Sequence, residues 1–412
     1  MLVQIATLIA ATSLVQLANG FFNTFLSLRL AGEDFGPEAT GFVLSSYFIG
    51  FTIGAVACGR VIQRVGHIRA YTAFAGAVVI GTAAMPLLIS PIAWAFCRAA
   101  IGMGCVGLFI TTESWLNAKA QPDQRGRIFS IYMVGTFMAL ALGQLLIARL
   151  PVQAAAPFQA IVMLFALALV MVSTTRAEAP LLKPEAGLPY GELSRQAPIA
   201  VIGCIVAGMV SSAVYGLVPA WMQSNGIAKE TIALFMLMVV LGGLALQVPV
   251  GKLSDRSDRR IVLAGLALGF AASAVLLVLV PRNLAVVLPV AALLGGFMST
   301  LYPVCVAHAL DRMPADRVVA VSGRLILVSG IGSTLGPLLG APIMGRLGID
   351  GLFYFMASAT LLLALAAWLR IRAKAPPERV ERPFEIMDPL TAPISQEPEA
   401  TEADGSPRPM AA

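Results

Sequence analysis

Apolar runs of about twenty residues recur along the whole chain, and each is long enough to cross a bilayer core roughly 30 Å thick. Of the 412 residues, 58% are hydrophobic and only 12% are charged, a composition that the surface of a water-soluble domain does not tolerate. The runs are continuously apolar instead of alternating, which favours helices over barrel strands. The sequence therefore predicts an all-α polytopic membrane protein with twelve spans. The expected spans are 4–28, 40–62, 70–91, 94–117, 128–149, 158–175, 198–222, 231–251, 261–280, 284–309, 320–345 and 351–371.

Positive charge is distributed unevenly between the two sides that these spans define. Most of the 28 Lys and Arg residues fall in the loops and tail that share a side with both termini. Because short cytoplasmic loops accumulate such charge, we expect a multi-pass protein of the bacterial cytoplasmic (inner) membrane with both termini in the cytoplasm. The net charge of +6 therefore reflects topology and does not indicate nucleic-acid binding. The basic residues expected on the opposite side are Arg29, Arg149, Lys229, Arg282 and Arg346.

The chain repeats itself once, at an offset of 192 residues. The segment 59–67 after the second span corresponds to 251–259 after the eighth, and the connection 122–125 corresponds to 314–317. Two anchors in one register indicate two related six-helix halves, an arrangement known from transporters. The expected organisation is an N-terminal half at 1–175, a cytoplasmic linker loop at 176–197, a C-terminal half at 198–371 and a disordered cytoplasmic tail at 372–412.

Several motifs resemble signatures of the major facilitator superfamily. Two of them are similar to its cytoplasmic signature, namely Gly59-x-x-x-Gln63-Arg64-x-Gly66 and Gly251-x-x-x-Asp255-Arg256. A third, Arg98-x-x-x-Gly102, is similar to its fourth-helix motif, and the segment from Glu113 to Asn117 resembles a YcaD-like branch of its bacterial members. The resemblance covers residues 1 to about 371. It implies a secondary transporter in which two six-helix halves alternately expose a central site.

The chain departs from the family pattern at two positions of the cytoplasmic signature. The pattern has Asp where this chain has Gln63, and Gly where it has Asp258. In the family the acid of this signature helps to lock the two halves together at the cytoplasmic side. The resemblance therefore implies that Asp255, in the second half, carries the lock here. The residues expected at the cytoplasmic gate are Arg64, Glu113, Arg125, Asp255 and Arg256.

Arg98 and Glu113 both lie inside the expected span 94–117 and need a physical reason, because a charge at mid-bilayer costs roughly 2.5–3.5 kcal/mol. Arg98 either snorkels outward beside Trp94, or lines the cavity and attracts an electron-rich or anionic group of the cargo. Glu113 lies about 22 Å further along the same helix, near its cytoplasmic end. It either forms salt bridges with the arginines of the inner gate or acts as a protonatable coupling site.

Uncharged polar side chains supply further candidates for the cavity, which the family builds from its first, fourth, seventh and tenth helices. Gln16, Asn19 and Asn23 share one face of the first span because they are spaced by three and four residues. For each candidate, a hydrogen bond between helices is the alternative to cargo binding. The expected cavity residues are Gln16, Asn19, Asn23, Arg98, Ser211, Tyr215, Ser299 and Tyr302.

Enzymatic, metal and nucleotide sites find no support in the sequence. The chain has only two histidines, no Cys-x-x-Cys pair and no phosphate-binding loop. The glycines at 102, 104 and 107 match a dinucleotide-binding pattern, but no expected strand precedes them. Small residues at this spacing are typical of close helix packing instead. We therefore expect no catalytic activity, no metal and no cofactor.

The sequence thus predicts a monomeric secondary transporter whose partners are the lipid bilayer and a small-molecule cargo, with protons as the candidate coupling ion. The scarcity of intramembrane charge favours a small organic solute that is neutral or mildly anionic, for example a vitamin such as riboflavin. Two alternatives stay open. One is proton-coupled efflux of a drug or metabolite, and the other is a membrane sensor that keeps the fold without transporting.

Overall fold

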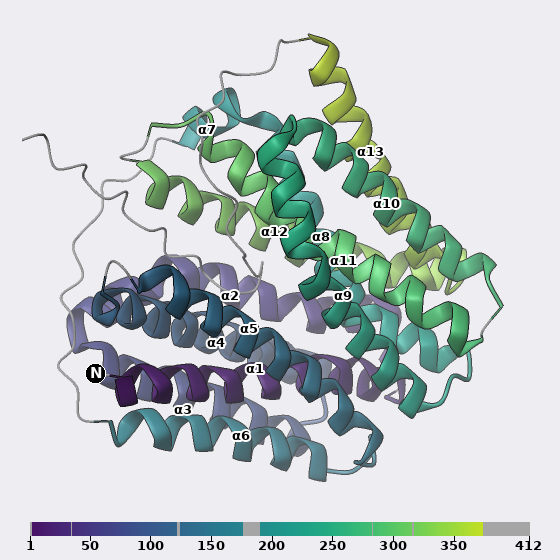
Figure 1. Cartoon of the computed structure of the whole chain (residues 1–412). Helices are drawn as coiled ribbons and strands as arrows, with labels where there is room; N and C mark the ends of the chain where they lie inside the picture. The colour runs from purple at the N-terminus through teal and green to yellow at the C-terminus, as the bar shows by residue number, and fades with distance from the viewer. Residues whose placement is uncertain are drawn as a thin grey trace, which may run out of the picture.

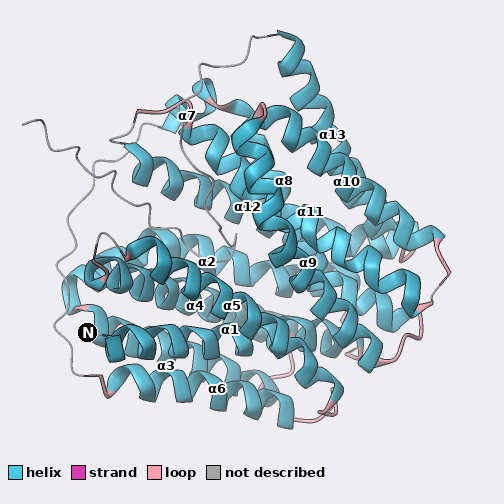
Figure 2. Ribbon diagram, viewed as in Figure 1, coloured by secondary structure: helices cyan, strands magenta, loops and turns pink. Residues whose placement is uncertain are grey.

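Twelve long helices dominate the computed structural model (Figure 1), which describes residues 2–33, 35–121, 124–175, 190–281, 283–314 and 317–373. Each of the twelve is long and apolar enough to cross a membrane. Figure 2 shows helices joined by short loops, and no strand occurs in the described residues. The predicted all-α fold with twelve spans is therefore confirmed.

The first six long helices are α1 (Leu2–Ala31), α2 (Pro37–Val65), α3 (His67–Ala84), α4 (Pro91–Lys119), α5 (Arg125–Leu145) and α6 (Ala156–Ser173). The second six are α8 (Pro198–Ser224), α9 (Lys229–Arg256), α10 (Arg259–Leu279), α11 (Leu284–Leu310), α12 (Val318–Leu347) and α13 (Gly351–Ala373). Three short helices complete the described chain, namely η1 (Met85–Leu87), η2 (Leu146–Ala148) and α7 (Tyr190–Gln196).

Prolines and one glycine fix several helix boundaries. The third span was predicted to run to residue 91. The regular helix instead ends at Ala84 and η1 ends at Leu87. Residue 91 cannot belong to this span because Pro91 is the first residue of α4. Between α2 and α3 the chain turns at Gly66, whose φ of +85° suits a residue without a side chain. The corresponding residue in the second half is Asp258, which has a φ of −60° and caps α10 through its side chain. The departure from the family's glycine thus replaces a backbone turn with a side-chain cap.

Part of the predicted organisation lies outside the described residues. The predicted linker, 176–197, is described only from residue 190, where it contains α7. The predicted tail, 372–412, is described only to residue 373.

The two six-helix halves repeat the same helix pairings. In the first half α2 packs on α4, α1 on α5 and α3 on α6. In the second half α9 packs on α11, α8 on α12 and α10 on α13. These pairs correspond one to one when the halves are aligned helix by helix. The predicted pair of related halves is therefore confirmed.

Equivalent glycines produce equivalent close helix crossings in the two halves. A Cβ atom added at Gly50 would collide with the α4 backbone, and one added at Gly102 would collide with the α2 backbone. In the second half, Gly242 and Gly295 approach the backbones of α11 and α9 in the same way. The glycine motif around residue 102 therefore serves helix packing, as predicted.

The halves contact each other near one end of the bundle. We call the end at which α6 ends and α8 begins the linker end, and the opposite end the far end. Toward the far end, the Ser45 hydroxyl of α2 donates to the Thr334 carbonyl of α12 at 2.7 Å. The Ser27 hydroxyl of α1 accepts from the backbone N–H of Ala220 of α8 at 3.1 Å. In Figure 1 the ribbons of the halves converge toward the far end and spread apart toward the linker end. The bundle is therefore closed at the far end.

Candidate transport site and gates

A line of polar contacts joins α1 to α4, and we call its five residues the α1–α4 seam. Nearest the far end, the Arg98 Nη2 donates to the Asn23 Oδ1 at 3.2 Å. Near the middle, the Cys105 thiol donates to the Asn19 Oδ1 at 3.6 Å, and the Asn19 Nδ2 donates to the Gln16 Oε1 at 3.3 Å. The amide stripe predicted on the first span therefore faces α4. Hydrogen bonding of this kind was the alternative to cargo binding, so a cargo role for these amides stays a prediction.

Arg98 is buried in the first half and does not snorkel outward. Its residue surface is only 2% exposed. The guanidinium carbon lies 4.5 Å from the centre of the Tyr47 ring and 5.1 Å from that of Phe22, which stabilises the cation through the faces of the rings. The Nε atom is buried without a hydrogen-bond partner, and Arg98 forms no ion pair with an acid in the described residues. The buried positive charge of Arg98 therefore has no counter-ion among the residues that the structure describes.

Glu113 lies near the linker end of α4 and is 0% exposed. Its Oε1 accepts a hydrogen bond of 3.1 Å from the Tyr132 hydroxyl of α5. Glu113 is thus a buried acid that is held by a hydrogen bond from α5.

The candidates of the second half are all buried on α8 and α11. Ser211 is 2% and Tyr215 9% exposed, while Ser299 is 4% and Tyr302 0% exposed. The hydroxyl groups of Ser211 and Tyr302 have no hydrogen-bond partner among the residues that the structure describes. An unmade hydrogen bond of a buried group costs about 1–3 kcal/mol, so both hydroxyls are available to a polar ligand. α8 contacts both α1 and α11, which places these side chains on helices next to the α1–α4 seam.

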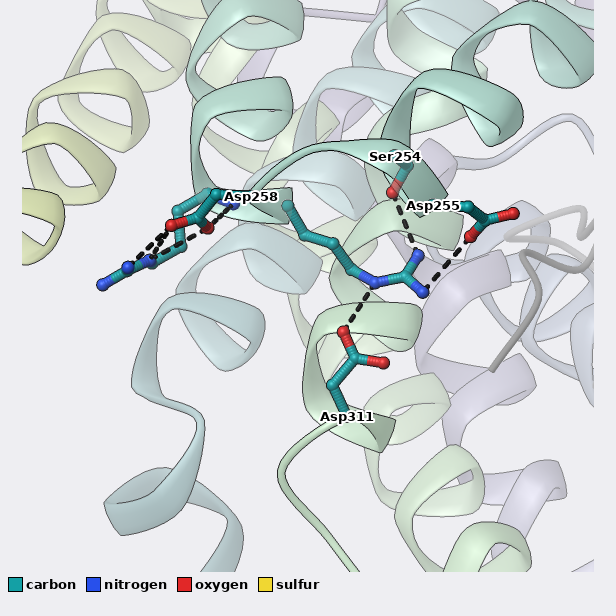
Figure 3. A network of polar contacts seen from close by, with 6 residues as sticks. Ser254, Asp255, Asp258 and Asp311 are labelled. Atoms are coloured by element: carbon teal, nitrogen blue, oxygen red, sulfur yellow. Dashed lines mark hydrogen bonds and ion pairs between the residues drawn. The ribbon is translucent and has the colours of Figure 1, made fainter. Parts of the chain in front are cut away.

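A charged network ties together three helices of the second half at the linker end (Figure 3). The Arg259 Nε donates to the Asp311 Oδ2 at 2.6 Å, and its Nη2 lies 3.3 Å from the Asp255 Oδ1. The Nη1 donates to the Ser254 hydroxyl at 3.0 Å. We call Asp255, Arg259 and Asp311 the C-half triad. In this structure Asp255 therefore pairs inside its own half, and its predicted role as a lock between the halves stays a prediction.

Next to the triad, Asp258 forms an ion pair with Arg260, at 2.7 Å between Oδ2 and Nη2 (Figure 3). Burial works to raise the pKa of Asp258, but the hydrogen bonds and the charge of Arg260 outweigh it and hold that pKa below its usual value. Asp258 therefore stays ionised and fixes Arg260 at the start of α10.

The first half lacks the charges of the C-half triad. At the same offset of 192 residues its counterparts are Gln63, His67 and Lys119. His67 is 1% exposed, and its Nε2 shares a hydrogen bond of 2.9 Å with the Ser114 hydroxyl. The equivalent position in the first half therefore carries a hydrogen-bonded imidazole instead of an arginine with two carboxylates.

The other predicted gate residues lie at the linker end as well. Arg64 and Arg256 are exposed near the ends of α2 and α9. The Arg125 Nη2 donates to the Asn117 carbonyl at 3.4 Å. These side chains share the linker end of the bundle, and their gating roles stay predictions.

The sequence profile of the Major Facilitator Superfamily matches residues 8–226 and, a second time, residues 200–400. An uncharacterized MFS-type transporter of Enterobacter sp. (strain 638) is 31% identical over 366 residues, which cover 87% of this chain and 93% of the relative. The MFS-type transporter YcaD of Escherichia coli (strain K12 / DH10B) is 29% identical over 360 residues, with coverage of 87% and 93%. These relatives confirm the resemblance to a YcaD-like branch.

Solved structures share the fold at lower sequence identity. The nucleoside transporter NupG matches with a TM-score of 0.73 at 14% identity, covering 90% of this chain and 100% of that chain. The D-xylose-proton symporter matches with a TM-score of 0.68 at 17% identity, covering 88% and 97%. A bacterial homologue of the lysosomal transporter Spinster, in its inward-facing and unoccupied conformation, matches with a TM-score of 0.70 at 15% identity, covering 91% and 99%. The profile match over most of its length, together with the fold and the relatives, shows that the chain belongs to the Major Facilitator Superfamily.

Proposed function

We propose that this chain is a secondary transporter that moves a small organic solute across the bacterial cytoplasmic membrane by alternating access. Membership in a family of transporters supports transport as its activity in place of catalysis. Closure of the bundle at the far end supports a conformation that receives or releases cargo at the linker end. The distribution of Lys and Arg supports a cytoplasmic position for the linker end and for both termini.

The buried guanidinium of Arg98 is the observation that carries the proposal about the cargo. A charge in the membrane interior costs roughly 2.5–3.5 kcal/mol, and here one amide and two aromatic rings offset only part of that cost. A carboxylate or an electron-rich ring of the cargo would supply the missing partner. The cargo is therefore a neutral or mildly anionic solute, preferably with a planar ring that packs beside Tyr47 or Phe22. Because Arg98 is 2% exposed in this state, the proposal requires that rocking of the halves uncovers it.

The experiment is a ligand screen with the purified protein, followed by flux measurements in liposomes. Neutral, anionic and cationic compounds, with riboflavin among the first, are tested for ligand-induced thermal stabilisation, and each binder is then tested by counterflow. Arg98→Gln removes the charge that pairs with the cargo and should weaken binding by about 2 kcal/mol, roughly thirtyfold. The matched control is Arg149→Gln, an exposed arginine at the far end, which should bind as the wild type does. Wild-type counterflow by the Arg98→Gln variant, or binders that are all cationic, would overturn the cargo proposal.

Proton-coupled efflux is a second candidate, and the burial of Glu113 favours it. A carboxyl group with 0% exposure inside a span exchanges protons only when a conformational change opens a path to it. Coupling of proton movement to the rocking of the halves is therefore physically available at this residue.

A further inference from the structure

Along the outer face of α13, the side chains change from apolar to aromatic and then to cationic as the helix reaches the linker end. Leu362 is 66%, Leu365 49% and Leu369 53% exposed, and in a membrane-spanning helix such side chains lie against lipid. Trp368, 44% exposed, follows on the same helix, and the guanidinium carbon of Arg372 lies 3.8 Å from the centre of its ring. Apolar, aromatic and cationic side chains thus follow one another in the order in which a bilayer presents acyl chains, interface and headgroups.

Contacts between elements bring Arg260, Arg312 and Arg370 to the same end of α13, because α10 bonds α13 at Arg370 and bonds Asp311, the residue before Arg312. We call these three residues the arginine cluster. The Arg260 Nη1 of α10 donates to the Arg370 carbonyl of α13 at 3.0 Å. The Arg312 Nη1, in the turn after α11, donates to the Gln196 carbonyl of α7 at 3.3 Å. The Arg312 Nε is buried without a hydrogen-bond partner. The Arg312 guanidinium therefore keeps one donor that the described residues do not satisfy.

The two carboxylates near the cluster already form ion pairs, one with Arg260 of the cluster and one with Arg259 outside it. Asp258 is paired with Arg260 at 2.7 Å, and Asp311 with Arg259 at 2.6 Å. Arg370 is exposed and forms no ion pair with a residue that the structure describes. Burial lowers the pKa of Arg312, and the charges of Arg260 and Arg370 lower it further, although Asp258 and Asp311 act in the opposite direction. Mutual repulsion of this kind is relieved by a bound anion.

We propose that the arginine cluster binds the phosphate of an anionic phospholipid headgroup, with the acyl chains lying along the exposed leucines of α13. Arg312 and Arg370 supply the donors to the phosphate, because Arg260 is already held by Asp258. The adjoining lipid-facing surface and Trp368 favour a lipid over a soluble phosphate, since a free ion gains nothing from that surface. The bound headgroup ties α10 and α13 to the turn after α11.

The test compares lipid binding by the purified full chain and two variants with equal loss of charge. Native mass spectrometry and a fluorescence titration measure the retention and affinity of phosphatidylglycerol, phosphatidylcholine and inorganic phosphate. One variant carries Arg312→Gln with Arg370→Gln, and the control carries Arg149→Gln with Arg346→Gln, two exposed arginines of the far end. Because a basic residue near an anionic headgroup contributes about a fivefold effect, the cluster variant should bind phosphatidylglycerol about 25-fold more weakly. The control should bind it as the wild type does.

Three results would overturn the proposal. The first is equal affinity of the wild type for phosphatidylglycerol and phosphatidylcholine. The second is an unchanged affinity of the cluster variant for phosphatidylglycerol. The third is displacement by millimolar inorganic phosphate with no preference for the lipid, which would assign the cluster to a soluble anion. If the double variant does not fold, Arg370→Gln alone carries the test with a loss of about fivefold, because that side chain is exposed. The assay measures binding without transport, so its outcome is independent of the proposed transport function.

Discussion

At the scale of single residues, Arg259 is the side chain on which the linker end of the second half depends. It bonds two carboxylates and one hydroxyl from α9 and from the residue that follows α11. Removing one partner of a buried ion pair leaves the others desolvated and uncompensated. Arg259 and Asp311 were not among the gate residues expected from the sequence. The spacing of four residues between Asp255 and Arg259 was a usable signal, whereas the contact with Asp311 joins distant segments.

We predict that Arg259→Gln lowers the free energy of unfolding by about 1–3 kcal/mol. The measurement is thermal unfolding of the purified variant in detergent. Arg256→Gln, three residues earlier and exposed, is the matched control and should unfold close to the wild type. Equal unfolding temperatures of both variants would show that the C-half triad contributes no stability.

Glu113 carries a prediction about energy coupling. In liposomes, Glu113→Gln should keep cargo counterflow, because exchange at equilibrium needs no net proton movement. It should lose accumulation driven by a pH gradient, because the amide cannot carry a proton. Glu230→Gln changes an exposed acid at the far end and should keep both activities. Accumulation that survives Glu113→Gln would exclude the coupling role.

The sequence predicted which residues belong to the candidate site better than it predicted which residues they contact. Spacing predicted that Gln16, Asn19 and Asn23 share one face, and the structure shows that this face meets α4. The burial of Arg98 between two aromatic rings was not readable, because the Tyr47 ring comes from α2 and only the packing of α2 on α4 brings it there. Long-range helix packing, which local patterns do not encode, decides which polar groups keep unused hydrogen-bonding capacity.

At the scale of helices, small residues set how closely the pairs α2–α4 and α9–α11 pack. We predict that Gly102→Ala destabilises the protein by about 1–3 kcal/mol, because the added methyl group meets the α2 backbone, which cannot move as a flexible side chain can. Gly265→Ala on α10 is the matched control, since nothing lies within 4 Å of its added Cβ. The measurement is thermal unfolding of both variants. The conclusion that Gly102 sets the closeness of the α2–α4 crossing would be contradicted if Gly102→Ala unfolded at the wild-type temperature while Gly265→Ala unfolded at a lower one.

Most helices were predictable because hydrophobic length and proline positions act locally. Predicted and observed spans differ mainly at their ends, as at α9, which runs to Arg256 beyond the expected 251. The extension is physically reasonable because the polar last turn of α9 belongs to the linker end, where a helix continues past its apolar stretch. Hydropathy alone marks the apolar stretch and does not mark that turn.

At the scale of the whole molecule, the protein consists of two repeated halves that are in contact toward the far end. Repetition of the sequence predicted the halves, and the matching helix pairings confirm them. The sequence contained no signal for which end is closed, because both ends are built from similar loops and one chain encodes every state of the transport cycle. Closure at the far end is a property of this conformation, and alternating access requires that it be reversible.

Cross-linking at the far end tests alternating access most directly. The Arg346 Nη2 lies 3.8 Å from the Glu38 Oε1 across the interface between the halves. Both side chains are exposed, so cysteines placed at these positions are accessible to a short bismaleimide. The variant carries Glu38→Cys and Arg346→Cys with the half-buried Cys97 replaced by Ala, and each single-cysteine variant is the control for labelling. We predict that the cross-linked protein in liposomes loses counterflow while the singly labelled controls keep it. Full counterflow by the cross-linked protein would contradict the claim that the far end must open during transport.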